Sequence, residues 1–119
     1  MHQDAALAAE ASLEAYKQKG NDGFWTMHDL LFDNQEAPES LKPAALIGYA
    51  SRMGLDLRAF RAALESRSHR TEVEADRAAA EAAGISGTPS FVINGYFVSG
   101  AQLFAKFRKV IDRALAEAK

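Results

Sequence analysis

Residues 87–100 read GTPSFVINGYFVSG, and this stretch decides the fold of the chain. Two short apolar runs, 91–93 and 96–98, flank an Asn-Gly pair at 94–95. Asn-Gly is the preferred pair for a two-residue type I′ turn, because both central residues of that turn take positive φ. The stretch therefore predicts one β-hairpin at about residues 88–99.

The two strands of this hairpin do not alternate apolar with polar residues. Strands that are apolar on both faces are typical of a sheet covered by helices on both sides. A two-stranded hairpin alone is marginal in water, so the pattern predicts further strands beside it. Pro89 stands at the entry of the first strand, where the missing backbone donor is tolerated.

The rest of the chain is helical in pattern, and no other segment reads as a strand. Apolar residues recur at helical spacing and stop at glycines such as Gly20 and Gly54, and Asp56 is placed to cap a helix. The sequence therefore predicts an α+β fold in a single domain, 1–119, with about six helices. The predicted helices cover about residues 5–19, 24–32, 43–53, 57–66, 71–83 and 101–118. The last helix is expected to present six apolar side chains to the core: Leu103, Phe104, Phe107, Val110, Ile111 and Leu115.

Composition excludes several classes of function. The net charge is −2 with a pI near 5.9, which gives no electrostatic argument for binding nucleic acid or an anionic membrane. The chain has no cysteine, so it has no disulfide, thiolate metal site or cysteine nucleophile. No signal peptide is visible at its start and no apolar run is long enough to span a membrane. As written, the sequence predicts a soluble, cytoplasmic chain.

Three motifs occur in an order that is specific for one family. Residues 24–32 read FWTMHDLLF, Leu55-Asp56 is followed by Phe60, and residues 84–95 read GISGTPSFVING. Together they resemble the helical insertion, a later helix and the cis-proline loop with its hairpin in DsbA-like thioredoxin-fold proteins. The resemblance covers nearly the whole chain, with the helical insertion at about 4–84.

This resemblance also indicates what the chain lacks. Members of the family begin with a strand, a Cys-x-x-Cys motif at a helix N-terminus and a second strand, so this chain resembles the remaining two thirds of a truncated fold. The resemblance implies that Thr88 and Pro89 correspond to the loop that lies beside the active cysteines and binds substrate backbone, with a cis peptide bond. It also implies a protein thiol-disulfide oxidoreductase family, whose members are often periplasmic or extracytoplasmic.

Other polar and aromatic residues are better explained by structure than by chemistry. His28 is expected to be a locally hydrogen-bonded histidine at the edge of the core, because no catalytic partner has suitable spacing. His2 and His69 are isolated, so we expect no metal site, and nothing in the sequence indicates a cofactor. Trp25 and the neighbouring phenylalanines are expected in the core. Four carboxylates are expected on solvated helix surfaces: Glu10, Glu14, Asp29 and Asp33.

Three functions stay open from the sequence. The first is a DsbA-like protein without catalytic residues or redox activity of its own, which forms a homodimer when residues Ser90, Phe91, Val92 and Ile93 pair with their own copy. The second is a fragment of a full-length thiol-disulfide oxidoreductase whose Cys-x-x-Cys half lies outside this chain; a variant is the glutathione-transferase-kappa or isomerase branch, with serine near the cysteine position. The third is a module that binds unfolded polypeptide around Pro89 and Trp25.

Overall fold

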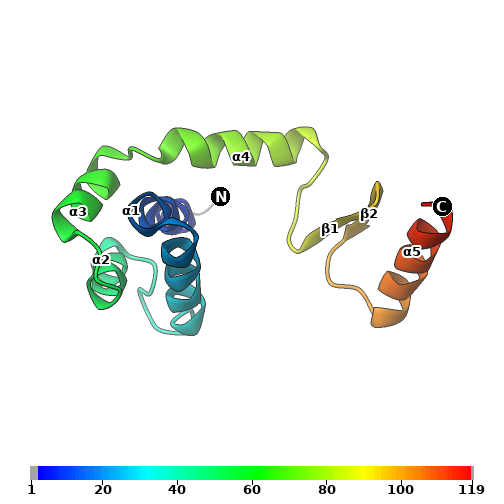
Figure 1. Ribbon diagram of the computed structural model, residues 1–119, viewed down its shortest axis with the longest axis horizontal. Helices are drawn as coiled ribbons and strands as arrows, with labels where there is room; N and C mark the ends of the chain where they lie inside the picture. Colours follow the sequence, from blue (N-terminus) through cyan, green and yellow to red (C-terminus); the bar gives the residue numbers. More distant parts are fainter. Residues whose placement is uncertain (1–2, 119) are drawn as a thin grey trace. The chain divides into compact units, whose positions relative to one another are not determined.

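The computed structural model describes residues 3–118 (Figure 1). Its fold class is α+β, as predicted. Within residues 3–118, four helices precede a single hairpin and one helix follows it. The elements are α1 (Gln3–Asp33), α2 (Pro43–Arg52), α3 (Leu57–Ser66), α4 (Arg70–Ala82), β1 (Ser90–Ile93), β2 (Tyr96–Ser99) and α5 (Phe104–Glu117). The described residues form five helices where about six were predicted, because α1 spans the first two.

A kink at Gly20 divides α1 into two parts that run in different directions (Figure 1). Gly20 has φ 67° and ψ −152°, a backbone conformation that is essentially restricted to glycine. The second part turns back so closely that a Cβ added at Gly23 would lie 2.4 Å from the carbonyl oxygen of Ala15. Gly20 thus interrupts the helix where the sequence predicted an end, and Gly23 permits the close approach.

The chain forms two compact units, residues 1–76 and 77–119. The prediction of a single domain stays a prediction, and the two units are described separately below. The boundary falls within α4, which has no buried residue. Exposed ion pairs one helical turn apart, Arg70 with Glu74 and Arg77 with Glu81, support this solvent-exposed helix.

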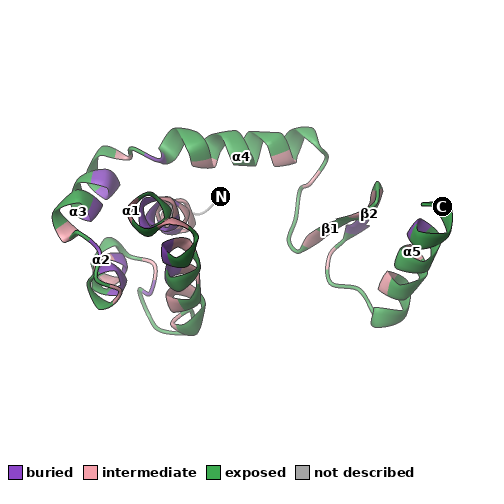
Figure 2. Ribbon diagram, in the orientation of Figure 1, coloured by how far each residue is buried: buried purple, intermediate pink, exposed green. Residues whose placement is uncertain are grey.

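The hydrophobic core of the first unit lies among α1, α2 and α3 (Figure 2). Three large side chains have no exposed surface: Met27 of α1, Leu46 of α2 and Phe60 of α3. Small residues of α1, including Ala11 and Ala15, are also fully buried and let these helices approach closely. Removing a buried side chain as large as Phe60 typically costs about 3–5 kcal/mol, so this core holds the unit together.

The local signals for α3 and the hairpin are confirmed. The Asp56 side chain accepts a hydrogen bond from the Ala59 backbone at 3.1 Å, as an N-cap does. Asn94 and Gly95 both have positive φ, 47° and 89°, as a type I′ turn requires. The strands pair antiparallel with Ile93 opposite Tyr96 and Ser90 opposite Ser99.

The second unit buries much less of its apolar surface than the sequence predicted (Figure 2). Only Val98 and Ala114 are buried among its described residues. Four of the apolar side chains expected in the core from the last helix are exposed instead: Leu103, Phe104, Ile111 and Leu115. Within this unit, α5 covers one face of the hairpin. Helical cover on both faces stays a prediction.

Trp25 corrects a further expectation, because 56% of its surface is exposed and it does not lie in the core. It stands on α1 in an edge-on stack with Phe24 and His28. Phe32, which contacts the ring of His28 one turn later, is equally exposed. Helical spacing placed these aromatic residues on one side of α1 but could not tell whether another element covers that side.

Among the described helices, none combines the length and the apolar character that a membrane crossing requires.

Candidate functional site

The open edge of β1 contains the residues that the sequence marked for self-association, Ser90 to Ile93. Among the described residues, β1 pairs with β2 alone. The Pro89 carbonyl accepts a hydrogen bond from the Gly100 amide at 2.8 Å, and hydrogen-bonded pairs alternate along an antiparallel ladder. Phe91 and Ile93 therefore direct their backbone groups toward β2. Ser90 and Val92 direct theirs outward, where they can accept another strand.

Thr88 and Pro89 lie immediately before β1, and both are exposed. Their peptide bond is cis, as the resemblance implied. The Ser90 hydroxyl donates to the Gly87 carbonyl and closes a tight turn around the proline. Trp25 belongs to the other unit, so the structure does not test a polypeptide-binding surface shared by Pro89 and Trp25, which stays a prediction.

The two faces of the hairpin differ in their cover. Phe91 faces α5, and its ring meets that of Phe107 edge-on with 4.9 Å between centroids. On the same face Val98 is 2% exposed. On the opposite face the cross-strand neighbours Val92 and Phe97 are 63% and 49% exposed. This face of the hairpin is therefore the less covered of the two within the second unit.

One side of α5 contacts β2 through polar side chains. The Tyr96 hydroxyl donates to the Glu117 carboxylate, and the guanidinium of Arg113 lies 5.0 Å from the centre of the Tyr96 ring. The hydrogen bond to Glu117 raises the pKa of Tyr96, and the same bond lowers the pKa of Glu117. The charged side chains on this side of α5 are therefore already paired with each other and with Tyr96.

The other side of α5 is apolar and uncovered. Successive residues turn by about 100° around a helix, so passing from Arg113 through Ala114 to Phe107 moves from the β2 side to the β1 side. Continuing in the same direction leads to Phe104, Ile111 and Leu115, which we call the outer stripe. These residues are 77%, 42% and 63% exposed. The apolar surface of α5 therefore continues past the strand that has the open edge.

A cluster of charged side chains in the first unit includes Glu10 and Glu14, which were expected on solvated helix surfaces. That expectation is wrong. Glu10 is 1% exposed and Glu14 is 3% exposed, so neither lies on a solvated surface. The Arg67 guanidinium donates from Nε and a terminal nitrogen to the two Glu10 oxygens at 2.6–3.0 Å. This bidentate pair joins α1 to the end of α3 across 57 residues of sequence. Asp29 and Asp33 are exposed, as expected.

His69 is not isolated, because it lies between two carboxylates. Its Nε2 is 2.9 Å from Glu14 of α1 and its Nδ1 is 3.1 Å from Glu72 of α4. Both ring nitrogens donate only in the protonated imidazole, so this arrangement favours the cation. Burial lowers the pKa of His69, but the hydrogen bonds and charges of Glu14 and Glu72 outweigh it and the net shift is upward.

This geometry predicts a pH-dependent contribution of His69 to stability. Because its pKa is higher in the folded chain, the contribution is complete below the ordinary histidine pKa and is lost as the pH rises through the raised value. We expect His69→Gln to lower the free energy of unfolding more at pH 5.5 than at pH 8.5. Urea titrations of both chains at the two pH values measure this difference. An equal penalty at both would show that the imidazole is neutral throughout.

The remaining candidates do not form a site. His28 bonds its neighbour Asp29 at 3.1 Å, the local arrangement that was expected. His2 lies outside the described residues. In the part of the chain that the structure describes, no three His, Asp or Glu side chains are arranged so that they could hold a metal ion.

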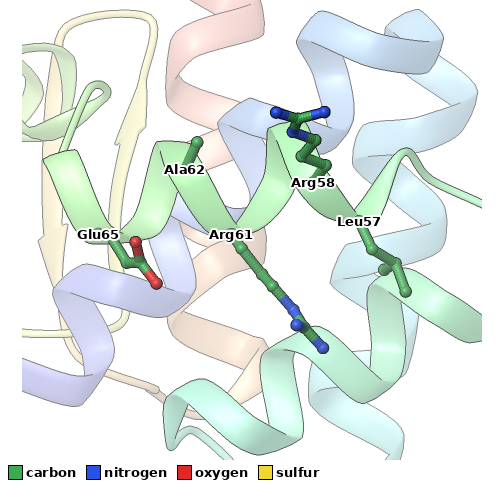
Figure 3. A pocket seen from close by; sticks show the side chains of 5 residues that line it. All are labelled: Leu57, Arg58, Arg61, Ala62 and Glu65. Carbon is green, nitrogen blue, oxygen red and sulfur yellow. The ribbon is translucent and has the colours of Figure 1, made fainter.

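A hollow of about 470 Å³ is lined by side chains of α3 alone (Figure 3). Arg61 and Glu65 are among these side chains, and both are exposed. With every lining residue on one helix, the hollow does not bring together groups from different elements. It is therefore not a candidate catalytic or binding site.

Comparisons with known proteins agree with the motifs. The DSBA-like thioredoxin domain matches residues 1–112. The chain is 38% identical over its full length to Na(+)/H(+) antiporter NhaA 3 of Salinispora tropica and 43% identical over 80% of its length to NhaA 1 of Salinispora arenicola. It is 39% identical over 84% of its length to the NhaA antiporter of Herminiimonas arsenicoxydans. The chain spans only 14–17% of the length of these relatives. No solved structure matches it.

Proposed function

This chain belongs to the DsbA-like thioredoxin domain family, and from that premise we propose that it is a non-catalytic member that self-associates through the open edge of β1. Thiol-disulfide exchange requires a thiolate, and the chain has no cysteine. The proposed function is that of an interaction surface, which pairs with a second strand.

One observation carries this proposal: β1 has unpaired outward backbone groups at Ser90 and Val92 beside exposed apolar side chains. A strand with these features is a template for pairing with another chain. The β2 edge is a poorer template, because the paired charges of Arg113 and Glu117 lie on its side of α5. Antiparallel pairing of Ser90–Ile93 with its own copy joins two hairpins into a four-stranded sheet in a homodimer.

The test is a proline at position 92. Because the Val92 amide points away from β2, Val92→Pro removes an outward donor and leaves the bonds between β1 and β2 intact. Phe91, the preceding residue, is already extended, as proline requires of its neighbour. We expect the wild-type chain to sediment as a dimer at micromolar concentration and Val92→Pro to raise the dimer dissociation constant at least tenfold.

Phe97→Pro is the matched control. Phe97 lies opposite Val92 in the same hairpin, and its amide points to the far edge of β2. This variant should remain dimeric. A dimer broken by Phe97→Pro but not by Val92→Pro would place the contact at β2, and a monomeric wild-type chain would overturn the proposal.

The length of the relatives supports a second candidate. Since the chain spans 14–17% of those antiporters, it corresponds to one segment of a much longer polypeptide in each of them. We propose as the alternative that this chain is part of a full-length DsbA-family thiol-disulfide oxidoreductase domain, in which a strand–helix–strand segment with Cys-x-x-Cys pairs with β1. An upstream reading frame that encodes a strand followed by Cys-x-x-Cys would support it. The longer product should then catalyse insulin reduction, and the isolated chain should not.

A further inference from the structure

The outer stripe of α5 extends past the open edge of β1 and not past β2. The order around the helix is fixed by contacts on the covered side: Arg113 and Glu117 lie against Tyr96 of β2, and Phe107 lies against Phe91 of β1. Phe104, Ile111 and Leu115 come next in the same direction. A strand added to β1 would therefore lie beneath this stripe.

We infer that the outer stripe of one copy packs against the outer stripe of a second copy, so that the two α5 helices form a lid over the strands joined at β1. This inference rests on the proposed self-association and adds a helix–helix contact to it. Two antiparallel strands are related by a two-fold axis perpendicular to the sheet. Both α5 helices consequently lie on the same face of the joined sheet, and their uncovered sides face each other across the axis.

Continuity with the open edge of β1 favours a second copy as the occupant. Arg108 and Asp112 border the outer stripe on its solvent side and lie 3.9 Å apart, so their charges are paired within one chain. The outer stripe itself contains no charged residue. A second copy joined at β1 presents the same uncharged apolar stripe across the two-fold axis.

The pairing register follows from which backbone groups point outward. Residues opposite each other must lie on the same face of the sheet, so the axis passes either between two copies of Phe91 or between two copies of Val92. The first register pairs Ser90 with the partner's Val92 and forms four outward hydrogen bonds within β1. The second pairs Ser90 with the partner's Asn94, which lies in the turn with φ 47°. The first register is therefore the one we assign.

Single cysteines test this register cleanly, because the chain has none of its own. In the assigned register the two copies of residue 91 form a non-hydrogen-bonded pair with Cα atoms about 4.5 Å apart, within reach of a disulfide. Copies of residue 92 are displaced along the strands to about 8 Å, which is too far to bridge. We expect Phe91→Cys to give at least tenfold more covalent dimer than Val92→Cys under mild oxidation.

A double variant tests the lid itself. Phe104 and Leu115 are well exposed, so Phe104→Ser with Leu115→Ser leaves the packed side of α5 unchanged. We expect it to raise the dimer dissociation constant at least tenfold in sedimentation experiments. Ala105→Ser with Ala116→Ser is the matched control, because both alanines are exposed on α5 outside the outer stripe. It should leave the dissociation constant unchanged.

The outcomes separate this inference from the proposal beneath it. A wild-type dimer with an unaltered dissociation constant in the outer-stripe variant would overturn the lid and leave pairing at β1 standing. A preference for covalent dimer at residue 92 would overturn the assigned register. A monomeric wild-type chain would overturn the proposed function itself.

Discussion

Replacing Arg67 by methionine is expected to lower the free energy of unfolding of the first unit by about 3–5 kcal/mol. The side chain of Glu10 is 1% exposed, and Arg67 supplies both of its bidentate contacts. Without the guanidinium, a carboxylate is left in a buried position with no cation beside it, and burial of an unpaired charge is costly. Methionine keeps a Cβ at position 67, whose φ is 55°, so the backbone strain there is unchanged.

The measurement is a urea titration followed by far-UV circular dichroism and by the fluorescence of Trp25, the single tryptophan, which reports on this unit. Arg70→Met is the matched control, since Arg70 pairs with Glu74 but both side chains are about 60% exposed. An exposed pair one turn apart contributes at most about 0.5 kcal/mol. Adding Glu10→Gln to Arg67→Met should recover part of the loss. A loss below about 1 kcal/mol for Arg67→Met would mean that Glu10 finds another donor.

Replacing Gly23 by alanine is expected to destabilise the first unit by up to about 3 kcal/mol. The new Cβ would stand 2.4 Å from the Ala15 carbonyl oxygen and 2.7 Å from the Cβ of Lys19. The nearest atom belongs to the backbone, so the two parts of α1 must separate to make room. That separation would loosen the packing of Met27, which follows Gly23 by one helical turn and is fully buried.

The same substitution at Gly48 should have the opposite sign. Gly48 lies inside α2, and a Cβ added there meets nothing within 4 Å. Alanine is favoured over glycine in a helix interior, so Gly48→Ala is expected to stabilise by up to about 1 kcal/mol. Thermal unfolding of both variants measures the contrast. Equal effects would show that the kink in α1 opens easily and that Gly23 is not constrained.

The motifs identified the family correctly, because each of them depends on local backbone geometry that neighbouring residues determine. The Asn-Gly turn, the Asp56 cap and the break at Gly20 each depend on residues within a few positions, and each is found where it was expected. The open edge of β1 could also be anticipated, since a hairpin with two apolar faces predicts further strands beside it, and β1 pairs only with β2 among the described residues. Self-pairing of that edge stays a prediction.

Burial was the main source of error. His69 was read as isolated and Glu14 as solvated, yet they bond each other across 55 residues of sequence. Trp25 was read as core and is exposed. The sequence did contain one signal that these carboxylates are buried. Glu10 and Glu14 lie one turn apart on α1 among alanines that pack into the core. Charged residues on such a face are rarely buried without partners, and Arg67 and His69 are the partners.

The sequence by itself determined the hairpin, its turn, the helix breaks and the absence of cysteine, because each depends on neighbouring residues or on composition alone. Only the tertiary structure decided which side of α5 is covered and which carboxylates are enclosed. Those outcomes depend on elements that meet from distant parts of the chain, and an apolar stripe reads the same whether or not a partner covers it. The outer stripe beside β1 and the enclosed carboxylates of α1 are therefore features that only the folded chain could reveal.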